Sequence, residues 1–457
     1  MIKKYLLPAA WLIMLSGLAA LVLLMTAFFY YVNYYERDLN LPGCTDTAAL
    51  NFDSSAVVNS GNCVYPRTVI SHTRRARMVS RAYESSGLLY WQHKFWTQND
   101  HADLNLYGFT FEEPLSVETV KLNGLQNIDW EEIVQDDNFL YVGDIGNNYG
   151  NRTNLLIYKI EKRSLQEEFL RYQVIRFRYE DQFYFGRRSR PGFGFDSEAF
   201  ILKGEYIYLF TKEMHTLKTS VYRIPNQAGN HVARRVNGFN SKGMITGAMY
   251  LQEERLLALV GYNFPFISAP FIWLHYDFEG DDFFGGNNRR IGLNYFQFMP
   301  LQIEAITTID GHSWYLTNEQ AGLRRPFRFG SVQMIHEINL NPFLEAYFAG
   351  LPEPDKYYFR GFGELTDPAN WFTNPNGSGR SPADFSAQGV SWHLTAEGEY
   401  QINQPWHISG EGSRLVIGNG EQPVKLTSRY PIKAQFKVKS ASELLINHIG
   451  VPSSANE

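Results

Sequence analysis

The feature that most constrains the fold is an internal repeat between residues 85 and 320. Five segments share the same parts: a small or acidic residue leads a short apolar strand, a polar turn follows, and a second aromatic-rich strand ends in threonine or glycine. The leading positions are Ser86, Glu131, Glu198, Gly247 and Glu304. The strand-ending positions are Thr97, Gly143, Thr211, Gly261 and Thr317. A repeat of this length predicts an array of equivalent supersecondary units.

Further strand-like sequence follows the first four strand pairs, as in "LLIYKIE" and "QVIRFRY" after the second pair. Four strands per unit would leave open edges unless the units close into a radial array. The fifth unit offers only three strands, ending in "VQMIHEINL", and "RTVISHTRRARMV" before the first unit can supply the fourth. We therefore predict an all-β fold with a five-bladed β-propeller over residues 67–345. Six blades stay open, because the long interval between residues 131 and 198 could hide a degenerate unit.

Several phrases of this region carry a family resemblance. "DWEEI", "YVGDIGNNYGNRTNLLIYKI" and "LTNEQ" together resemble an uncharacterised family of secreted bacterial β-propellers. The resemblance covers the whole repeat region and implies the same propeller fold. The recurring Glu-Ala pairs are more distantly similar to phytase-like esterase and lactonase-type propellers, which is a fold analogy with little functional weight.

The N-terminus indicates export. Residues 1–35 hold two lysines followed by an uncharged apolar stretch from Tyr5 to about Val32, long enough to cross a bilayer. This segment is predicted to be either a membrane-spanning signal-anchor helix or a cleaved signal peptide. Because Lys3 and Lys4 precede it, the rest of the chain is expected outside the cytoplasm, anchored in the membrane or secreted to the cell surface.

Residues 40–66 contain the only two cysteines of the chain. In an oxidising compartment Cys44 and Cys63 are predicted to form a disulfide. The segment resembles a small module of bacterial surface proteins and is interpreted as a stapled spacer. The alternative is a calcium loop that uses oxygen atoms of its polar residues, which are Asp46, Asn51, Asp53 and Asn59.

Residues 352–457 differ in composition from the repeats. A turn-rich stretch is followed by short alternating strands, and the phrases "GELTDPANW" and "ISGEGSRLVIGNG" resemble a β-roll or β-solenoid-like module of bacterial surface proteins. Such a module is expected to support or display the propeller. Its tryptophans Trp371, Trp392 and Trp406 are expected in the core, with stacking on a sugar ring as the alternative.

Three glutamates at matching repeat positions form the candidate site. In a propeller the first strand of each blade lines the central channel, so Glu131, Glu198 and Glu304 should face one axis. Converging carboxylates repel unless they bind a cation, accept hydrogen bonds or share protons. Calcium suits such oxygen ligands, and a hydrogen-bonded structural girdle is the alternative. Oxygen atoms at the strand ends could extend a ligand site at one mouth, from Asn99, Asp144, Asn318 and also Glu213, Asn263 and Glu319.

The sequence favours binding over catalysis. It holds no nucleophile elbow, zinc-protease helix, phosphate-binding loop or dinucleotide fingerprint, and the glycines of "GDIGNN" are interpreted as turn residues. A net charge of -5 offers no attraction for nucleic acid. The favoured function is noncatalytic binding of a glycan or protein ligand at the cell surface. The alternative is a calcium-dependent hydrolase of a phosphoester, ester or lactone, for which His101, His215 and His275 are candidate bases by residue type only.

Overall fold

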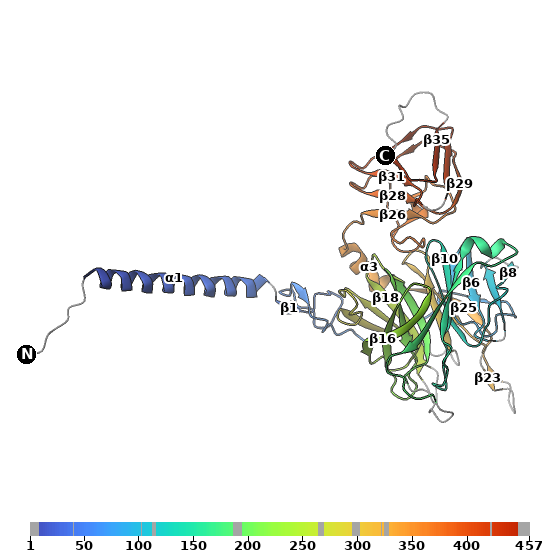
Figure 1. Ribbon diagram of the computed structural model, residues 1–457, viewed down its shortest axis with the longest axis horizontal. Helices are drawn as coiled ribbons and strands as arrows, with labels where there is room; N and C mark the ends of the chain where they lie inside the picture. The colour runs from blue at the N-terminus through green and yellow to red at the C-terminus, as the bar shows by residue number, and fades with distance from the viewer. Residues whose placement is uncertain are drawn as a thin grey trace, which may run out of the picture.

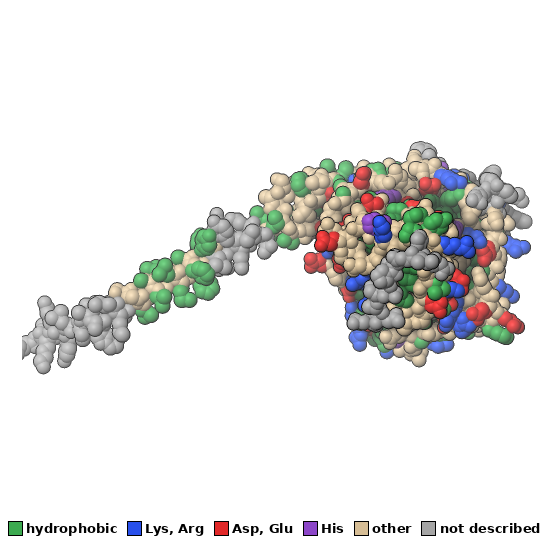
Figure 2. Space-filling model, turned by 90° about the horizontal axis from the view of Figure 1, so that it is seen from above, with side chains coloured by type: hydrophobic (Ala, Val, Ile, Leu, Met, Phe, Trp, Pro, Cys, Tyr) green, Lys and Arg blue, Asp and Glu red, His purple; other side chains and the backbone are tan. Residues whose placement is uncertain are grey.

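The computed structural model describes residues 9–39, 41–101, 103–111, 116–185, 194–263, 269–294, 302–320, 322–323, 329–420 and 423–446. The described chain is mostly β-structure (Figure 1). The long helix α1 (Ala9–Leu39) projects away from the sheets in Figure 1, and Figure 2 shows hydrophobic side chains along it. In the part of the chain whose side chains are described, no helix combines the length and the hydropathy needed to span a bilayer.

The repeat region folds into five successive groups of strands, which we call units 1 to 5. Unit 1 consists of β5 (Leu89–Trp91), β6 (Lys94–Gln98), β7 (Asn105–Phe109) and β8 (Val117–Lys121). Unit 2 consists of β9 (Trp130–Gln135), β10 (Phe139–Asp144), β11 (Leu156–Glu161) and β12 (Tyr172–Tyr179). Unit 3 consists of β13 (Ser197–Lys203), β14 (Tyr206–Thr211), β15 (Thr219–Pro225) and β16 (Gly229–Phe239).

Units 4 and 5 continue the same plan. Unit 4 consists of β17 (Met244–Leu251), β18 (Leu256–Asn263), β19 (Ala269–Tyr276) and β20 (Asn287–Leu293). Unit 5 consists of β21 (Ile303–Thr308), β22 (Ser313–Asn318) and β25 (Met334–Asn339), with a small hairpin of β23 (Gly322–Leu323) and β24 (Phe329–Gly330) between its last two strands. Within each unit successive strands pair antiparallel, and a parallel contact between β12 and β16 joins units 2 and 3 into one sheet.

The first strands of the five units are neighbours in a closed cycle. Each contacts the next in the order β5, β9, β13, β17, β21, and β21 contacts β5 again. The apolar cores lie between adjacent units: Tyr141 and Phe200 join units 2 and 3, and Phe210 and Leu259 join units 3 and 4. This ring of sheets is a propeller-like arrangement that places the first residues of the inner strands around a common centre.

The segment before unit 1 closes the ring, as the strand deficit of unit 5 predicts. Strand β4 (Arg74–Arg77) pairs antiparallel with β25, so that Ala76 faces Ile335. The preceding strand β3 (Thr68–Ile70) instead runs parallel to β20 and extends unit 4. The predicted pairing is therefore confirmed for residues 74–77. It is wrong for Val69, which pairs with Gly292 because the chain crosses unit 4 before it reaches unit 5.

Deleting residues 66–80 tests this closure. We expect the deletion to destabilise all five units together, because it exposes the edges of β20 and β25 and opens the ring. Thermal unfolding followed by circular dichroism should show a lower midpoint for the whole β signal. An unchanged midpoint in the truncated protein would contradict closure by this segment.

The predicted disulfide is confirmed. Cys44 and Cys63 are bonded, and the short strand β2 (Val58–Asn59) of the loop between them pairs parallel with β1 (Pro42–Gly43), which directly precedes Cys44. The loop is docked on unit 4 and is more than a spacer, since Asp46 accepts hydrogen bonds from Tyr65 at 2.7 Å and from Tyr276 at 2.6 Å.

The other polar residues of the loop also have internal partners. Asn59 donates to Asp277 at 2.8 Å, Asn51 accepts from the Val64 amide, and Asp53 accepts from Ser55. Together with the two hydrogen bonds to Asp46, these contacts hold the loop in place, and the calcium-loop alternative stays a prediction.

The C-terminal part is built from parallel strands. Helix α3 (Asn341–Gly350) leads into a parallel ladder of β26 (Lys356–Phe359), β28 (Ser391–Leu394), β31 (Arg414–Ile417) and β34 (Gln435–Val438). A second parallel ladder consists of β29 (Gly398–Ile402), β32 (Val424–Ser428) and β35 (Glu443–Ile446), and a third pairs β30 (Trp406–His407) with β33 (Ile432–Lys433). We call residues 356–446 the C-terminal module.

The tryptophans of the C-terminal module form its core. Trp371 and Trp392 are fully buried, Trp406 is 4% exposed, and all three pack in one apolar cluster. Core packing is therefore confirmed, and stacking of these rings on a sugar is wrong because no face is open to solvent.

One buried carboxylate joins the C-terminal module to unit 4. Glu254, at the turn between β17 and β18, has no exposed surface. Its side chain accepts hydrogen bonds from the Thr373 hydroxyl, from Asn374 Nδ2 at 2.9 Å and from the Arg380 amide at 3.1 Å. Asn374 in turn accepts from the backbone amide of Gln252 at 3.1 Å. The module is thus fixed to the face of the ring that carries the turns after the first strands.

Candidate functional site

Each inner strand has an irregularity at the same place. In units 2 to 5 the pairing of the first two strands shifts by one residue, which leaves one extra residue in the first strand. The extra residues are Glu131, Glu198, Thr246 and Glu304. In unit 1 an equivalent shift separates the Ser85–Asn99 bridge from the β5–β6 ladder, next to Ser86. Such β-bulges re-aim a side chain, so a polar residue is directed inward at the same level of every unit.

The register corrects one sequence-based equivalence. Unit 4 contributes Thr246, and not Gly247, at the bulged position. Gly247 does not occupy the bulged position. A glycine is needed at position 247 because a Cβ would lie 2.6 Å from the Glu304 carbonyl oxygen of unit 5. The bulged residues also connect neighbouring units: Thr246 donates to the Ile303 carbonyl at 2.6 Å, and Ser86 donates to the Glu131 carbonyl at 2.6 Å.

Two of the three predicted glutamates meet in one buried carboxylate group. Carboxylate oxygens of Glu131, Asp196 and Glu198 lie within 4.8 Å of one another. All three side chains are buried, with exposed fractions of 6%, 3% and 3%. Burial, followed by the nearby Glu198 charge, raises the pKa of Glu131 well above its usual value. By ligand type and spacing this group could hold a hard divalent cation.

The "GDIGNN" loop of unit 2 holds this group in place. A Cβ on Gly146 would lie 2.2 Å from Glu131 Oε1 and 2.4 Å from Asp129 Oδ2, so only glycine allows the backbone to approach both carboxylates. The amide of Asn147 donates to Asp196 Oδ1 at 2.6 Å. The loop therefore has a part in the candidate site beyond that of a turn.

Lys212 supplies an internal cation to these acids. It directly follows β14, its side chain is 13% exposed, and its ammonium group is paired with Glu198 Oε1. The carboxylates of Glu198, Asp196 and Glu131 all act on it, and together they outweigh burial and raise the pKa of Lys212 well above its usual value. Lys212 is therefore held as an ammonium, in the place where the sequence predicts a calcium ion.

Glu304 belongs to the same electrostatic neighbourhood from unit 5. It is 8% exposed, and burial followed by the neighbouring Glu319 raises its pKa well above the usual value. Lys212 and Glu198 also act on Glu304, but its oxygen atoms lie outside the close group of Glu131, Asp196 and Glu198. The three predicted glutamates thus face one region, and only two of them share a possible metal position.

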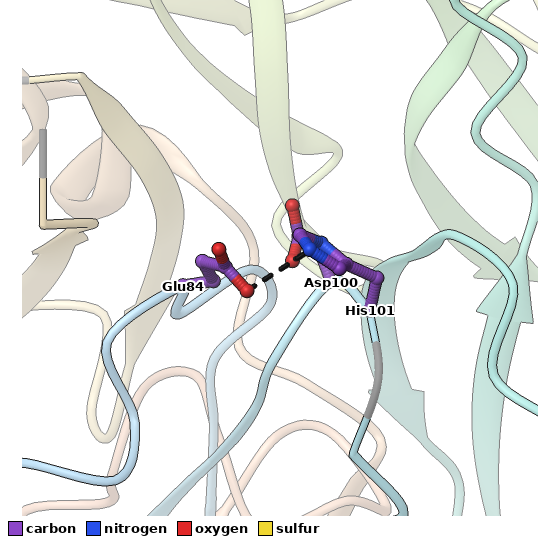
Figure 3. Close-up of side chains that lie close together, drawn as sticks. All are labelled: Glu84, Asp100 and His101. Atoms are coloured by element: carbon purple, nitrogen blue, oxygen red, sulfur yellow. Dashed lines mark hydrogen bonds and ion pairs between the residues drawn. The ribbon is translucent and has the colours of Figure 1, made fainter.

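A second group, from unit 1, borders this region. Figure 3 shows Glu84 next to Asp100 and His101, and His101 Nδ1 lies 2.6 Å from Asp100 Oδ1 and 3.4 Å from Glu84 Oε2. Burial lowers the pKa of His101, but the two carboxylates outweigh it and the net direction is upward. Burial and the Asp100 charge raise the pKa of Glu84 to about 7. Of the candidate bases, His101 belongs to this group. His215 is exposed in the loop after β14, and His275 is buried with its Nδ1 2.6 Å from Asn288.

We call these side chains the axial acid cluster. Besides Lys212 and His101 it contains the carboxyl groups of Glu84, Asp100, Asp129, Glu131, Asp196, Glu198, Glu304 and Glu319. Sequence reasoning missed Lys212 and several of these acids, because they follow or precede strands where polar residues are usual. The signal that could have found them is their position, one to three residues from a leading or ending position of a repeat.

Three of the predicted strand-end ligands, Asn99, Asp144 and Asn318, have other partners. Asn99 bonds to Arg81, Glu84 and Asp103, and Asn318 accepts from His336 at 2.8 Å. Asp144 pairs with Arg152 at 2.6 Å and accepts from the Asp129 amide at 3.2 Å. These side chains shape the loops around the axial acid cluster, and their oxygens are committed to those bonds.

Another axial carboxylate fits the girdle interpretation. Glu132 is 2% exposed, and its oxygens accept from the Ile133 amide at 3.0 Å and, across the ring, from the Ala248 amide of unit 4 at 3.2 Å. Burial raises its pKa well above the usual value. The centre of the ring thus contains a structural carboxylate, Glu132, whose oxygens both accept hydrogen bonds. The axial acid cluster lies next to it, and its carboxyl groups have fewer hydrogen-bond partners among the described residues.

Replacing Glu319 with glutamine tests the charge of the cluster. Burial and Asp100 raise its pKa to about 7, so the folded state keeps this proton in a pH range where the unfolded state, with the ordinary glutamate pKa of 4.5, has lost it. Stability therefore falls as the pH rises from about 4.5 to about 7, and above pH 7 the folded state carries the full cost of the buried charge. We expect Glu319→Gln to raise the free energy of unfolding by about 1–3 kcal/mol at pH 8.5 and to have no effect near pH 4.

Urea unfolding at both pH values measures this difference. The exposed Glu345→Gln on α3 is the matched control and should leave stability unchanged at each pH. An equal effect of Glu319→Gln at pH 4 and pH 8.5 would contradict a raised pKa.

Comparisons with known proteins find distant structural likenesses and no family. No family model matches the chain, and no curated protein matches it. It is similar to the PQQ-bound aldose sugar dehydrogenase of Streptomyces coelicolor, at 10% identity and a TM-score of 0.35, over 59% of this chain and 97% of that one. It is also similar to the catalytic domain of a GH62 α-L-arabinofuranosidase of Coprinopsis cinerea, at 8% identity and a TM-score of 0.35, over 59% and 96%.

Proposed function

We propose that this chain is an exported five-bladed β-propeller protein that binds a glycan or protein ligand at its axial acid cluster. Each of units 1 to 5 would be one blade, with the C-terminal module as a solenoid-like support on the opposite face. The observation that carries the proposal is the repeated bulge, because all five inner strands direct a polar side chain to one centre. A packed core has no need of such a concentration of polar groups, whereas a ligand site does.

The charge of the cluster limits the ligand. Eight carboxyl groups surround one lysine and one histidine, and most of those acids have raised pKa values because their charges are buried together. A ligand with positive charge, or a neutral glycan held through a calcium ion, would relieve this repulsion. Glu131, Asp196 and Glu198 are the residues that would hold calcium.

Export is part of the proposal. The Cys44–Cys63 disulfide is consistent with an oxidising compartment, and the apolar N-terminal segment would be either its cleaved signal or its membrane anchor. Figure 2 shows Lys and Arg side chains mixed with Asp and Glu over the face seen from above.

Hydrolysis is the second candidate, and one observation favours it. Glu84 and Glu319 have pKa values raised to about 7 and Asp129 to about 6, in each case with burial as the largest cause. A carboxyl group that holds its proton near neutral pH can act as a general acid. An ester or lactone suits this acidic site better than a phosphoester, whose negative charge the carboxylates would repel unless calcium is bound.

One set of measurements separates the two functions. Purified protein is screened on glycan and protein arrays and assayed on ester, lactone and phosphoester substrates, with calcium and with a chelator. Binding is expected to need the cluster, so Glu131→Gln and Glu198→Gln should weaken it while Glu443→Gln, an exposed glutamate of the C-terminal module, should not. Turnover that disappears in the same two variants would establish the hydrolase instead. Retention of all binding in both variants would refute a site at the cluster.

A further inference from the structure

A groove lies between the ring and the C-terminal module. Its volume is about 330 Å³, at the lower end of the usual size of ligand sites. One wall comes from the strand turns of units 1 and 2, with Trp91 and Phe139, and the other from the module, with Phe362 and Tyr400. We call this space the interdomain groove.

The interdomain groove is separate from the axial acid cluster. Glu131 lies near the start of β9, whereas Asp137 of the groove follows the end of the same strand. At about 3.3 Å per residue the length of the strand separates the two regions, so they lie on opposite faces of the ring. A ligand in the groove would therefore leave the cluster free.

The walls of the groove combine aromatic rings with polar groups that lack partners. Trp91, Phe362 and Tyr400 are each partly exposed. Among the described residues, neither Asp137 Oδ1 nor Arg360 Nε has a hydrogen-bond partner, although both atoms are buried. One is an acceptor and the other a donor, and an unpaired buried polar atom is costly unless a ligand or water satisfies it.

The charges that line the groove balance. The lining contains three basic residues, which are Lys162, Arg163 and Arg360. It also contains three acidic residues, which are Asp137, Glu161 and Glu397. Most of this charge is already engaged, since Arg163 pairs with Glu161 at 2.9 Å and Lys162 donates to the Asp136 carbonyl at 2.6 Å. A balanced lining gives no net attraction to a charged ligand and favours a neutral one that offers both donors and acceptors.

The walls are also held at a fixed separation. The hydrogen bonds of Glu254 with Thr373 and Asn374 tie the module to unit 4, and His93 of unit 1 packs against Phe362 with ring centroids 3.4 Å apart. A groove whose walls are fixed before binding loses little entropy when a ligand enters.

We propose that the interdomain groove binds a short segment of a neutral glycan, as a second site independent of the axial acid cluster. A sugar ring has an apolar C–H face that can stack on Trp91 or Phe362. Its hydroxyl groups both donate and accept, so they can satisfy Asp137 Oδ1 and Arg360 Nε together. A simple apolar ligand would leave those two atoms unpaired.

The test titrates the full-length protein with neutral oligosaccharides: cellopentaose, xylopentaose, laminaripentaose and chitopentaose. Calorimetry and intrinsic tryptophan fluorescence report binding. We expect at least one sugar to bind, and we expect Trp91→Ala and Phe362→Ala each to weaken it roughly tenfold or more. Asp137→Asn leaves the side-chain volume unchanged and should also weaken sugar binding. This variant is the test if circular dichroism shows that either aromatic variant does not fold.

Controls separate this site from the proposed function. Tyr430→Ala removes a 43% exposed ring of the same module outside the groove and should leave the affinity unchanged. Glu131→Gln should also leave it unchanged, so loss of groove binding and loss of cluster binding can be told apart. The proposal is overturned if none of the four sugars binds, or if a bound sugar is insensitive to all three groove variants. Binding of sulfated or uronic-acid oligosaccharides alone, abolished by salt, would overturn its neutral-ligand assignment.

Discussion

Replacing Lys212 with methionine is expected to lower the free energy of unfolding by about 3–5 kcal/mol at pH 8, which is the usual cost of leaving buried charges without their partner. The ammonium group is paired with Glu198, and Asp196 and Glu131 also act on it. Methionine fills a similar volume but carries no charge. The loss should therefore be electrostatic, and chemical denaturation followed by tryptophan fluorescence measures it.

The pH dependence identifies the cause. Without the ammonium group the neighbouring carboxyls can reduce their repulsion only by taking up protons, so the loss should shrink as the pH falls from 8 to 5. Lys218→Met, at an exposed lysine in the loop that follows, is the matched control and should cost little. A pH-independent loss would point to packing instead of charge.

The same variant tests the calcium prediction. In the wild-type protein Lys212 already neutralises part of the charge of Glu198, so calcium should compete with it and stabilise the fold weakly. In Lys212→Met the group of Glu131, Asp196 and Glu198 has no internal cation, and calcium should raise the melting temperature more than in the wild type. Equal responses to calcium in both proteins would contradict a shared position for the two cations.

The repeat carries most of the information about the ring. Leading acids at matching positions were sufficient to predict that Glu131, Glu198 and Glu304 face one region, because equivalent strand positions share a direction. The shared direction does not come from the regular alternation of side chains along a strand. Each of the three glutamates is the extra residue of a β-bulge. A bulge changes the count of residues, and this is why sequence comparison selected Gly247 where the structure uses Thr246.

Other parts of the site depend on contacts that no local pattern contains. In the sequence Lys212 is an ordinary polar residue after a strand. Its interaction with the acids of units 2 and 5 exists only when unit 3 packs beside them in the ring. The same holds for Glu254, a turn glutamate in the sequence whose partners lie more than a hundred residues away. Long-range pairing of polar groups is specified by the whole fold, so periodicity predicts the sheets well and these partnerships poorly.

Replacing Glu254 with alanine is expected to detach the C-terminal module from the ring. The carboxylate is fully buried and accepts from Thr373, Asn374 and the Arg380 amide, so its removal leaves several donors unsatisfied inside the junction. Breaking a buried charged network of this kind costs about 3–5 kcal/mol. The effect should be concentrated at the junction, because the ring and the module each have a core of their own.

Two measurements follow the detachment. Limited proteolysis should cut the variant between residues 350 and 380 faster than the wild type, and urea unfolding should separate into two transitions where the wild type has one or a closer pair. Glu253→Ala is the matched control, since that neighbouring side chain is exposed. Detachment would also remove one wall of the interdomain groove, so glycan binding there should be lost while ligand binding at the axial acid cluster persists. If Glu254→Ala kept the junction resistant to protease and unfolding unchanged, the module would be held mainly by its apolar contacts with the ring.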